Sequence, residues 1–263
     1  MDGLSLTFNA LAYLAVLIFW MGLGLRLWLW LETPVPFRIP TTPAPKTRSG
    51  AWARVAGEVV AFRSLYRADR ALWLGSWLFH LTFLLLAIRH LRYFLYPVPG
   101  WVVALAPIAG LLGLLFVLPG VYLFLRRLLI DRVRYGSLLS DYLVLLLLLA
   151  IGTLGLLIKY VAPVDLVEVK AFLLGLITLS PTTIPAHPLF LIHFTLVLIL
   201  VAYFPFSKLL HAPGVFLSPT RNQPNDGRRR LHVNPWDPPD PLQIADRRLQ
   251  ISHSAIRNSQ SEI

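Results

Sequence analysis

The sequence predicts an all-α integral membrane protein, a bundle of five transmembrane helices. Of the 263 residues, 56% are hydrophobic and only 14% are charged, whereas a soluble domain carries about 25% charged residues. The apolar residues gather in Leu-rich blocks, and a block of roughly 18 or more can cross the hydrocarbon core of a bilayer. The sequence contains no cysteine, which excludes disulfides, cysteine-ligated clusters and thioether-attached haem.

Five apolar blocks follow one another along the chain. The first is too long for a cleavable signal peptide and has no basic segment before it. A shorter stretch, Ala171–Leu179, lies between Pro163 and Pro181. It is too short to span, so we expect an interfacial or re-entrant helix on the outer side. The expected spans are residues 4–31, 71–96, 101–125, 141–161 and 188–210.

The positive charges predict the orientation of the bundle. The net charge is +11, and 20 of the 24 Lys and Arg residues fall at one end of the spans, in residues 32–70, 126–134 and the tail, or at the adjoining helix ends. The other four are Arg89, Arg92, Lys159 and Lys170. Because cytoplasmic loops are rich in Lys and Arg, we expect the amino terminus outside and the tail in the cytoplasm. Orientation therefore explains the charge without a nucleic-acid partner.

Two segments outside the spans are rich in proline. Residues Thr33–Pro45 are expected to form an extended cytoplasmic connector. Residues 213–263 are rich in Pro, Arg and Asn and have little apolar periodicity, so we expect this tail to order on a cytoplasmic partner. The chain thus divides into a membrane domain, residues 1–212, and a cytoplasmic tail, residues 213–263.

Five of the seven histidines lie at membrane depth or at its edge, where an ionisable side chain suggests a function. His80 and His90 are ten residues apart in the second span, and His193 and His211 are eighteen apart at the fifth. Eighteen residues are five helical turns, so His193 and His211 share a face if the helix is regular. Since the two spans run in opposite directions, His80 pairs in depth with His211, and His90 with His193. Two bis-histidine haems require such cross-helix pairs.

One feature of the spacing conflicts with this pairing. Along a helix, ten residues cover about 15 Å and eighteen cover about 27 Å, so the two histidine rows differ in length. A kink or helix end at Pro205 would remove part of the difference. Spacing alone therefore supports the His90–His193 pair better than the His80–His211 pair.

These residues resemble those of a known family. The 10- and 18-residue histidine spacings on the second and last spans are similar to those of the dihaem cytochrome b subunit of respiratory nitrate reductase, the gamma subunit. The stretch Phe206–Gly214 and the later SPTRN and HVNPW motifs resemble more closely the membrane cytochrome of the Dsr sulfur-metabolism complex, subunit M. The long loop after the first span also favours the Dsr relative.

The resemblance implies two haem b groups, an inner one on His80 and His211 and an outer one on His90 and His193. It implies oxidation of menaquinol or ubiquinol near the outer haem. It also implies electron exchange with a cytoplasmic iron–sulfur subunit, similar to heterodisulfide reductase, in dissimilatory sulfur metabolism at the cytoplasmic (inner) membrane. No centre for the final substrate chemistry is evident, so we predict an electron-transfer subunit and name no catalytic residue.

Other interpretations stay open. The chain could serve a nitrate-reductase-like complex as its gamma-type subunit, transport protons or a metal through its histidines, or act as a structural anchor. The interiors of the second and fifth spans contain no carboxylate, which disfavours transport. Arg89, Arg92 and Lys208 could pair with haem propionates, although snorkelling to the interface is the simpler role. His187 could accept a quinol proton or merely begin a helix.

Overall fold

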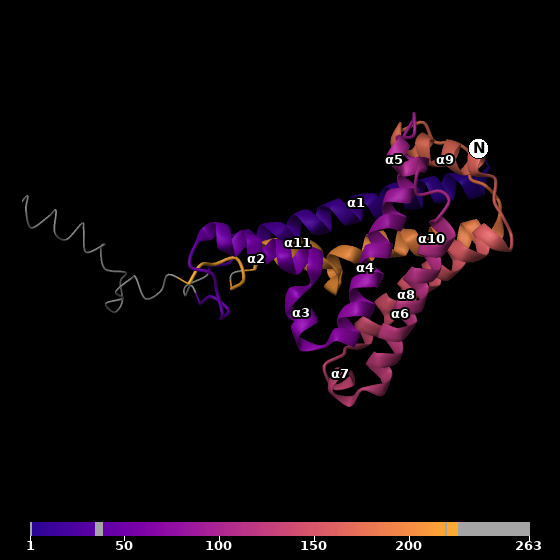
Figure 1. Cartoon of the computed structure of the whole chain (residues 1–263). Coiled ribbons are helices and arrows are strands. Elements are labelled where there is room, and N and C mark those ends of the chain that lie inside the picture. Colours follow the sequence, from indigo (N-terminus) through magenta and orange to yellow (C-terminus); the bar gives the residue numbers. More distant parts are fainter. Residues whose placement is uncertain (1, 35–38, 219, 226–263) are drawn as a thin grey trace, which may run out of the picture. The chain divides into compact units, whose positions relative to one another are not determined.

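The structure is a computed structural model that describes residues 2–34, 39–218 and 220–225, which form helices joined by turns (Figure 1). The chain divides into two compact units. The first comprises residues 1–34 and 57–215, and the second comprises residues 35–56 and 216–263. The first unit contains all the long helices and all four histidines for which we predict a ligand role.

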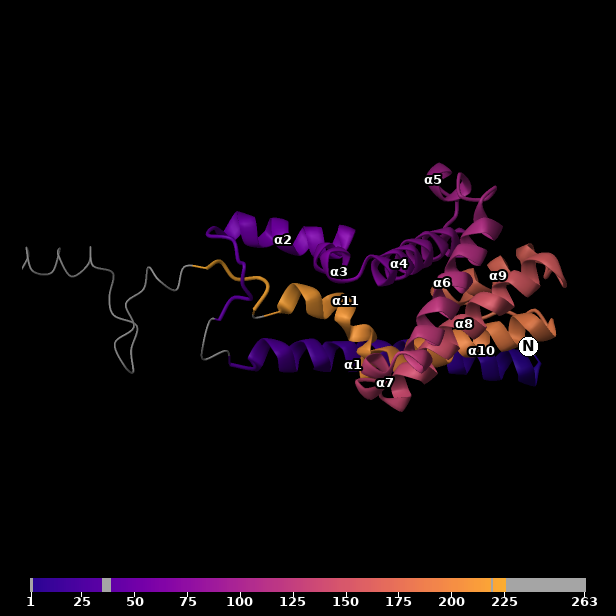
Figure 2. The same ribbon diagram turned by 60° about the horizontal axis from the view of Figure 1, so that its bottom comes forward.

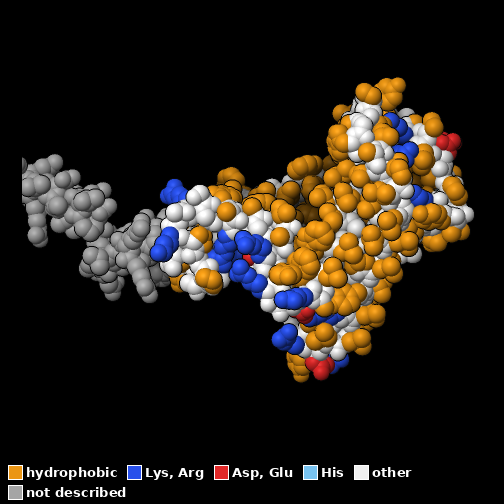
Figure 3. All heavy atoms as spheres, viewed as in Figure 1, with side chains coloured by type: hydrophobic (Ala, Val, Ile, Leu, Met, Phe, Trp, Pro, Cys, Tyr) orange, Lys and Arg blue, Asp and Glu red, His pale blue; other side chains and the backbone are white. Residues whose placement is uncertain are grey.

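Five helices of the first unit are long and apolar enough to cross a membrane, which confirms the all-helical class and the number of spans. Large apolar side chains such as Trp20, Leu118 and Leu139 are exposed along them, and Figure 3 shows this apolar surface over the helices. Such an exposed surface requires lipid around it. The helices are α1 (Gly3–Glu32), α4 (Arg70–His90), α6 (Ala109–Leu129), α8 (Leu139–Tyr160) and α10 (Pro188–Tyr203).

The five helices pack in a fixed order: α4 on α6, α6 on α8, α8 on α10, and α10 on α1 (Figures 1 and 2). Glycines allow the close approach of α6 and α8. A Cβ atom on Gly113 would lie 2.6 Å from Leu156 Cδ2, and one on Gly152 would lie 2.7 Å from Phe116 Cδ1. Helices α4 and α10 pack closely on these neighbours rather than on each other. The distance between the two histidine-bearing helices is therefore set through α6 and α8.

The third span begins later than the sequence predicts. Residues near Trp101 form a separate short helix, α5 (Gly100–Val103), followed by turns, and α6 begins only at Ala109. Proline disfavours the helical conformation in the residue before it, so Pro107 interrupts the apolar block at Ala106. The second span also ends earlier than residue 96, because α4 passes at His90 into the 3₁₀ turn η1 (Leu91–Tyr93).

The fifth span is not one regular helix up to His211, so the condition under which His193 and His211 would share a helical face is not met, and the helix ends near Pro205 as the unequal histidine spacings suggested. Helix α10 ends at Tyr203, and Ser207 is extended between two 3₁₀ turns. Pro205 explains the break, because proline has no N–H and its ring clashes with the carbonyl four residues earlier. The elements after α10 are η2 (Phe204–Phe206), η3 (Lys208–Leu210), α11 (His211–Gly214) and η4 (Val215–Leu217).

Several shorter helices connect the spans. The apolar stretch Ala171–Leu179 lies largely in a short helix, α9 (Leu166–Ile177), which begins earlier than predicted, and its first turn is capped by the side chain of Asp165, which accepts from Val167 N at 2.7 Å. The connector before α4 contains two helices that the sequence analysis did not predict, α2 (Arg48–Ala61) and α3 (Arg63–Ala68). The small helix α7 (Asp131–Tyr135) lies between α6 and α8.

Polar side chains near the start of α1 bind the loop before α10. The Ser5 hydroxyl accepts a hydrogen bond from Ile184 N at 3.0 Å, and the Asn9 amide donates to Thr182 O at 3.0 Å. One turn further on, the Tyr13 hydroxyl donates to Leu176 O at 3.1 Å. Ser5 and Asn9 are buried, and a buried polar group is stable only when it is paired. These bonds therefore fix α1 against the segment that leads into α10.

The second unit joins the Pro-rich connector to the residues after η4. Thr41 N donates to Thr220 O at 3.1 Å, and Asn225 N donates to Pro45 O at 2.7 Å. Arg54 also donates to Thr41 O, at 2.7 Å. The beginning of the tail is thus paired with the connector. The rest of the predicted tail, residues 226–263, lies outside the described residues.

Asp69 links the start of α4 to the end of α6. Its carboxylate accepts from Leu72 N at 2.9 Å as the helix cap and from the Arg126 guanidinium at 2.5 Å. The hydrogen bond from the Leu72 amide and, to a smaller extent, the Arg126 guanidinium hold the pKa of the Asp69 carboxyl below its ordinary value. A carboxyl with a lowered pKa in the folded state stabilises that state above its unfolded pKa, and the contribution disappears as the pH falls through the folded pKa.

We therefore expect Asp69→Asn to lower the Tm at pH 7, and we expect the difference from the wild type to shrink as the pH falls below about 4 toward the folded pKa. Thermal unfolding in detergent, followed by circular dichroism at pH 7 and pH 3, measures both differences. Asp131→Asn is the control, because Asp131 forms an exposed ion pair with Arg134 within α7. An Asp69→Asn variant with the wild-type Tm at pH 7 would contradict the role of this carboxylate.

Candidate functional site

Two of the predicted histidines meet across the bundle. His80 lies in the middle of α4, and His211 begins α11 after the break at Pro205. Their ring centres are 5.9 Å apart and the ring planes are at 87°. Two imidazoles on opposite sides of one metal ion have ring centres about 6 Å apart, because each metal–nitrogen bond is about 2 Å long. The spacing of the two rings therefore suits a single metal centre between them.

Three of the four histidines are oriented by a backbone carbonyl. The Nδ1 atom of His80 lies 2.7 Å from Ser76 O, that of His90 2.7 Å from Leu86 O, and that of His211 2.8 Å from Lys208 O. A carbonyl oxygen can only accept, so Nδ1 carries the proton in each ring and Nε2 keeps its lone pair in the neutral form. This is the state in which histidine ligates a metal, with the second nitrogen held by a hydrogen bond.

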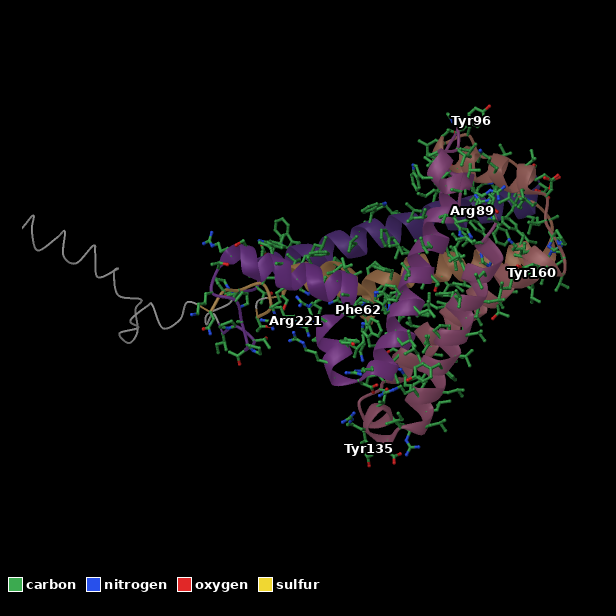
Figure 4. All side chains as sticks on the ribbon, in the orientation of Figure 1. Phe62, Arg89, Tyr96, Tyr135, Tyr160 and Arg221 are labelled. Carbon is green, nitrogen blue, oxygen red and sulfur yellow. The ribbon has the colours of Figure 1, made fainter. Side chains whose placement is uncertain are left out.

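Aromatic side chains enclose the ring of His80. Phe62 and Phe79 make edge-to-face contacts with it, with ring centres 5.2 Å and 5.5 Å away. Phe62 lies at the corner between α2 and α3 (Figure 4), in the left-handed conformation with φ 48°. This conformation costs a non-glycine residue roughly 1–2 kcal/mol. The neighbouring carbonyls of Val60 and Ala61 accept from the indoles of Trp77 and Trp73, at 2.9 Å and 2.8 Å, which holds the corner against α4.

His90 and His193 form the second predicted pair. They lie at the other end of α4 and near the start of α10. His193 is half-buried, and its Nδ1 has no hydrogen-bond partner within the described chain. A Cβ atom on Gly155 of α8 would lie 3.6 Å from His193 Cε1. The absence of a side chain at Gly155 leaves space beside this ring.

The histidines form pairs rather than larger clusters. Within the described residues, no three or more His, Cys, Asp or Glu side chains gather where they could hold a metal ion. Protein sites for bare zinc or similar ions use at least three side-chain ligands. Two facing imidazoles instead suit a metal whose other ligands come from a macrocycle, as in haem.

The other predicted residues have different surroundings. Lys208 forms an ion pair with Asp141 at 2.7 Å, a role that the sequence did not suggest. Arg92 lies over the ring of Tyr93, with its guanidinium carbon 5.2 Å from the ring centre. His187 occupies the N-cap position of α10 but makes no capping hydrogen bond through its side chain, and its Nδ1 is buried without a hydrogen-bond partner among the described residues. His232 and His253 lie outside the described residues.

Sequence analysis missed Phe62, Asp141 and Gly155. A carboxylate at the start of an apolar span was a detectable signal for Asp141, because charged residues at helix ends usually have a partner. No sequence signal identifies Phe62 or Gly155, because Phe62 contacts His80 from the corner between α2 and α3, and Gly155 lies beside His193 on α8.

Comparison with known proteins identifies the family. The model of the nitrate reductase gamma subunit family matches residues 58–221. The chain belongs to the nitrate reductase gamma subunit family. The chain is also similar to the "Hdr-like menaquinol oxidoreductase cytochrome b-like subunit" of Archaeoglobus profundus, with 40% identity over 90% of this chain and 84% of that protein. The protein of the same description from Archaeoglobus fulgidus is also 40% identical, over 87% of this chain and 82% of its own length.

The predicted relationship to the gamma subunit of nitrate reductase is thereby confirmed. The match of this gamma-family chain includes His80, His90, His193 and His211, together with Phe62 and Asp141. It therefore covers both histidine pairs, Phe62, which contacts His80, and Asp141, which binds Lys208.

Proposed function

We propose that the chain is a dihaem cytochrome b subunit that transfers electrons between menaquinol and the other subunits of a membrane redox complex. The observation that carries the proposal is the 5.9 Å separation of the His80 and His211 rings, which is close to the spacing of two imidazoles on one metal. The names of the 40%-identical relatives support both the cytochrome b assignment and menaquinol as the electron donor.

The residues present fit two haem groups. His80 and His211 would hold one, and His90 and His193 the other, each through Nε2. Carbonyls of Ser76, Leu86 and Lys208 hold three of these rings in the ligating tautomer. A bound haem supplies one-electron chemistry whose potential depends on its ligands and surroundings. Phe62 and Phe79 exclude water from the His80 ring and lower the local dielectric constant.

We further propose that the end of the bundle carrying His80 and His211 faces the cytoplasm. Twenty of the 24 Lys and Arg residues lie at this end of the spans or beyond it, and the other four lie at the opposite end. The pair of His90 and His193 would then lie toward the outer side. We place quinol oxidation near this outer pair, and His187 at the start of α10 is the candidate to accept a quinol proton.

The proposed partner at the cytoplasmic end is an iron–sulfur subunit similar to heterodisulfide reductase, because the relatives are described as Hdr-like. The tail, residues 213–263, would bind it, and the complex would act in dissimilatory sulfur metabolism at the cytoplasmic membrane. A gamma-type role in a nitrate-reductase-like complex is the second candidate, favoured by the family match itself. Transport of a bare metal ion is disfavoured by the lack of three-ligand clusters in the described chain.

The test uses the purified full-length protein in detergent. We expect about two non-covalent haems per chain, both extractable by acid acetone and both giving low-spin bis-histidine spectra. A water-soluble menaquinol analogue should reduce them without another subunit. Haem that resists extraction, or a well-folded protein expressed with ample haem that binds none, would overturn the proposal.

A further inference from the structure

His211 owes its position to contacts made after α10 has ended. The helix stops at Tyr203, and Ser207 is extended, so regular helix does not carry the orientation of His193 on to His211. His211 instead follows directly on the short turn η3, Lys208–Leu210. Whatever fixes η3 therefore fixes the ring of His211.

The side chain of Lys208 in η3 is held by Asp141 at the start of α8. Lys208 Nζ lies 2.7 Å from Asp141 Oδ2, which also accepts from Leu138 N at 2.9 Å. Arg127 at the end of α6 adds a second cation, 3.6 Å from the same oxygen. The Asp141 side chain is only 6% exposed, whereas that of Lys208 is 64% exposed. The buried Asp141 carboxylate is thus held in place by its surroundings, and it in turn fixes the more exposed Lys208 side chain.

The backbone of the same lysine orients His211. The Lys208 carbonyl accepts the Nδ1 hydrogen of His211 at 2.8 Å. A hydrogen bond to the second ring nitrogen sets the direction of a ligating histidine and increases its basicity. One residue therefore binds Asp141 through its side chain and His211 through its backbone, and a continuous set of contacts joins α8 to the His211 ring.

We propose that Asp141 is a positioning residue for the His80–His211 site: it holds Lys208, and so fixes the direction in which His211 presents Nε2. This inference rests on the proposed function, in which His211 ligates a haem. Asp141 does not contact the ring and takes no part in electron transfer itself. Its loss should leave His80 in place and affect the His90–His193 site little.

The experiment measures haem loss from the full-length purified protein to excess apomyoglobin, which separates the two haems by their rates. His211→Ala first identifies the spectral component that belongs to this site. Asp141→Asn and Lys208→Gln should each increase the rate of loss of that component about tenfold, the usual effect of removing a residue that orients a metal ligand. The electron paramagnetic resonance signal of the same ferric haem should shift, and that of the other haem should not.

Matched variants separate positioning from a general effect of charge. Lys208→Arg keeps the cation and should remain close to the wild type. Asp131→Asn removes a carboxylate from an exposed ion pair with Arg134 at 2.7 Å and should also remain close. The double variant Asp141→Asn with Lys208→Gln should lose haem no faster than either single variant, because both changes break the same contact.

The outcomes that overturn the inference are distinct from failure of the proposed function. Haem-loss rates within twofold of the wild type for both single variants would overturn it, as would a large effect of Asp141→Asn with none of Lys208→Gln. If Asp141→Asn does not fold, Lys208→Gln at its exposed position decides alone. A wild-type protein without any His211-dependent haem would instead refute the proposed function, before these variants are compared.

Discussion

His80→Ala and His211→Ala should remove the same haem, and His90→Ala and His193→Ala should remove the other. Each variant should keep about half of the reduced α-band absorbance, because each ligand pair holds one of two similar haems. The physical reason is the pairing across the bundle, in which the His80 and His211 rings are 5.9 Å apart. Reduced-minus-oxidised spectra and paramagnetic resonance of the four purified variants measure the effect.

His187→Ala provides the matched control. His187 is also a histidine at the edge of α10 with a buried ring nitrogen, but it has no paired imidazole in our assignment. We expect this variant to retain both haems. The pairing would be wrong if His80→Ala and His211→Ala lost spectroscopically different haems, even with the total haem content halved in each.

Gly22→Leu should destabilise the protein and weaken the His211 site together. Gly22 on α1 lies against Pro205, in the turn that follows α10. A Cβ atom at Gly22 would lie 2.7 Å from Pro205 Cβ. Pro205 is fully buried, so the added side chain has to displace η2 and the segment leading to His211. Overpacking of this kind typically costs about 1–3 kcal/mol. We expect a lower Tm and a specific loss of the haem that His211→Ala also removes.

Gly24→Leu is the control for this prediction, since it places the same side chain two residues along the same helix. A Cβ atom on Gly24 meets nothing within 4 Å, so this variant should keep the wild-type Tm and both haems. Equal effects of the two substitutions would show that glycine matters for α1 itself rather than for its contact with Pro205.

The hydropathy of the sequence predicted those parts of the fold that depend on short-range patterns of apolar residues, namely the helices and their directions. Five apolar blocks gave five helices, and the opposed directions of the second and fifth spans gave the pairing of His80 with His211 that the structure brings together. The nine-residue apolar stretch near Ala171 likewise gave the short helix α9.

The sequence analysis failed where one residue interrupts a uniform apolar pattern or where distant segments meet. Pro107 delays α6, yet the apolar composition continues through it. The end of α10 near Pro205 was anticipated, because the mismatch between the two histidine spacings indicated a break there. The ion pair between Lys208 and Asp141 joins residues 67 positions apart. Phe62 contacts His80 from the corner between α2 and α3. Neither contact leaves a periodic trace in the sequence.

The packing order of the helices has a consequence for engineering the protein. The separation of α4 and α10 accumulates over three successive interfaces, α4 with α6, α6 with α8, and α8 with α10. Close contacts set the thickness of these layers, such as Gly75 against Tyr122 and Gly113 against Leu156. One added methyl group in any layer should therefore widen the separation of α4 and α10. Under the proposed function, these glycines offer a graded adjustment of the space between His90 on α4 and His193 on α10 that leaves both histidines unchanged.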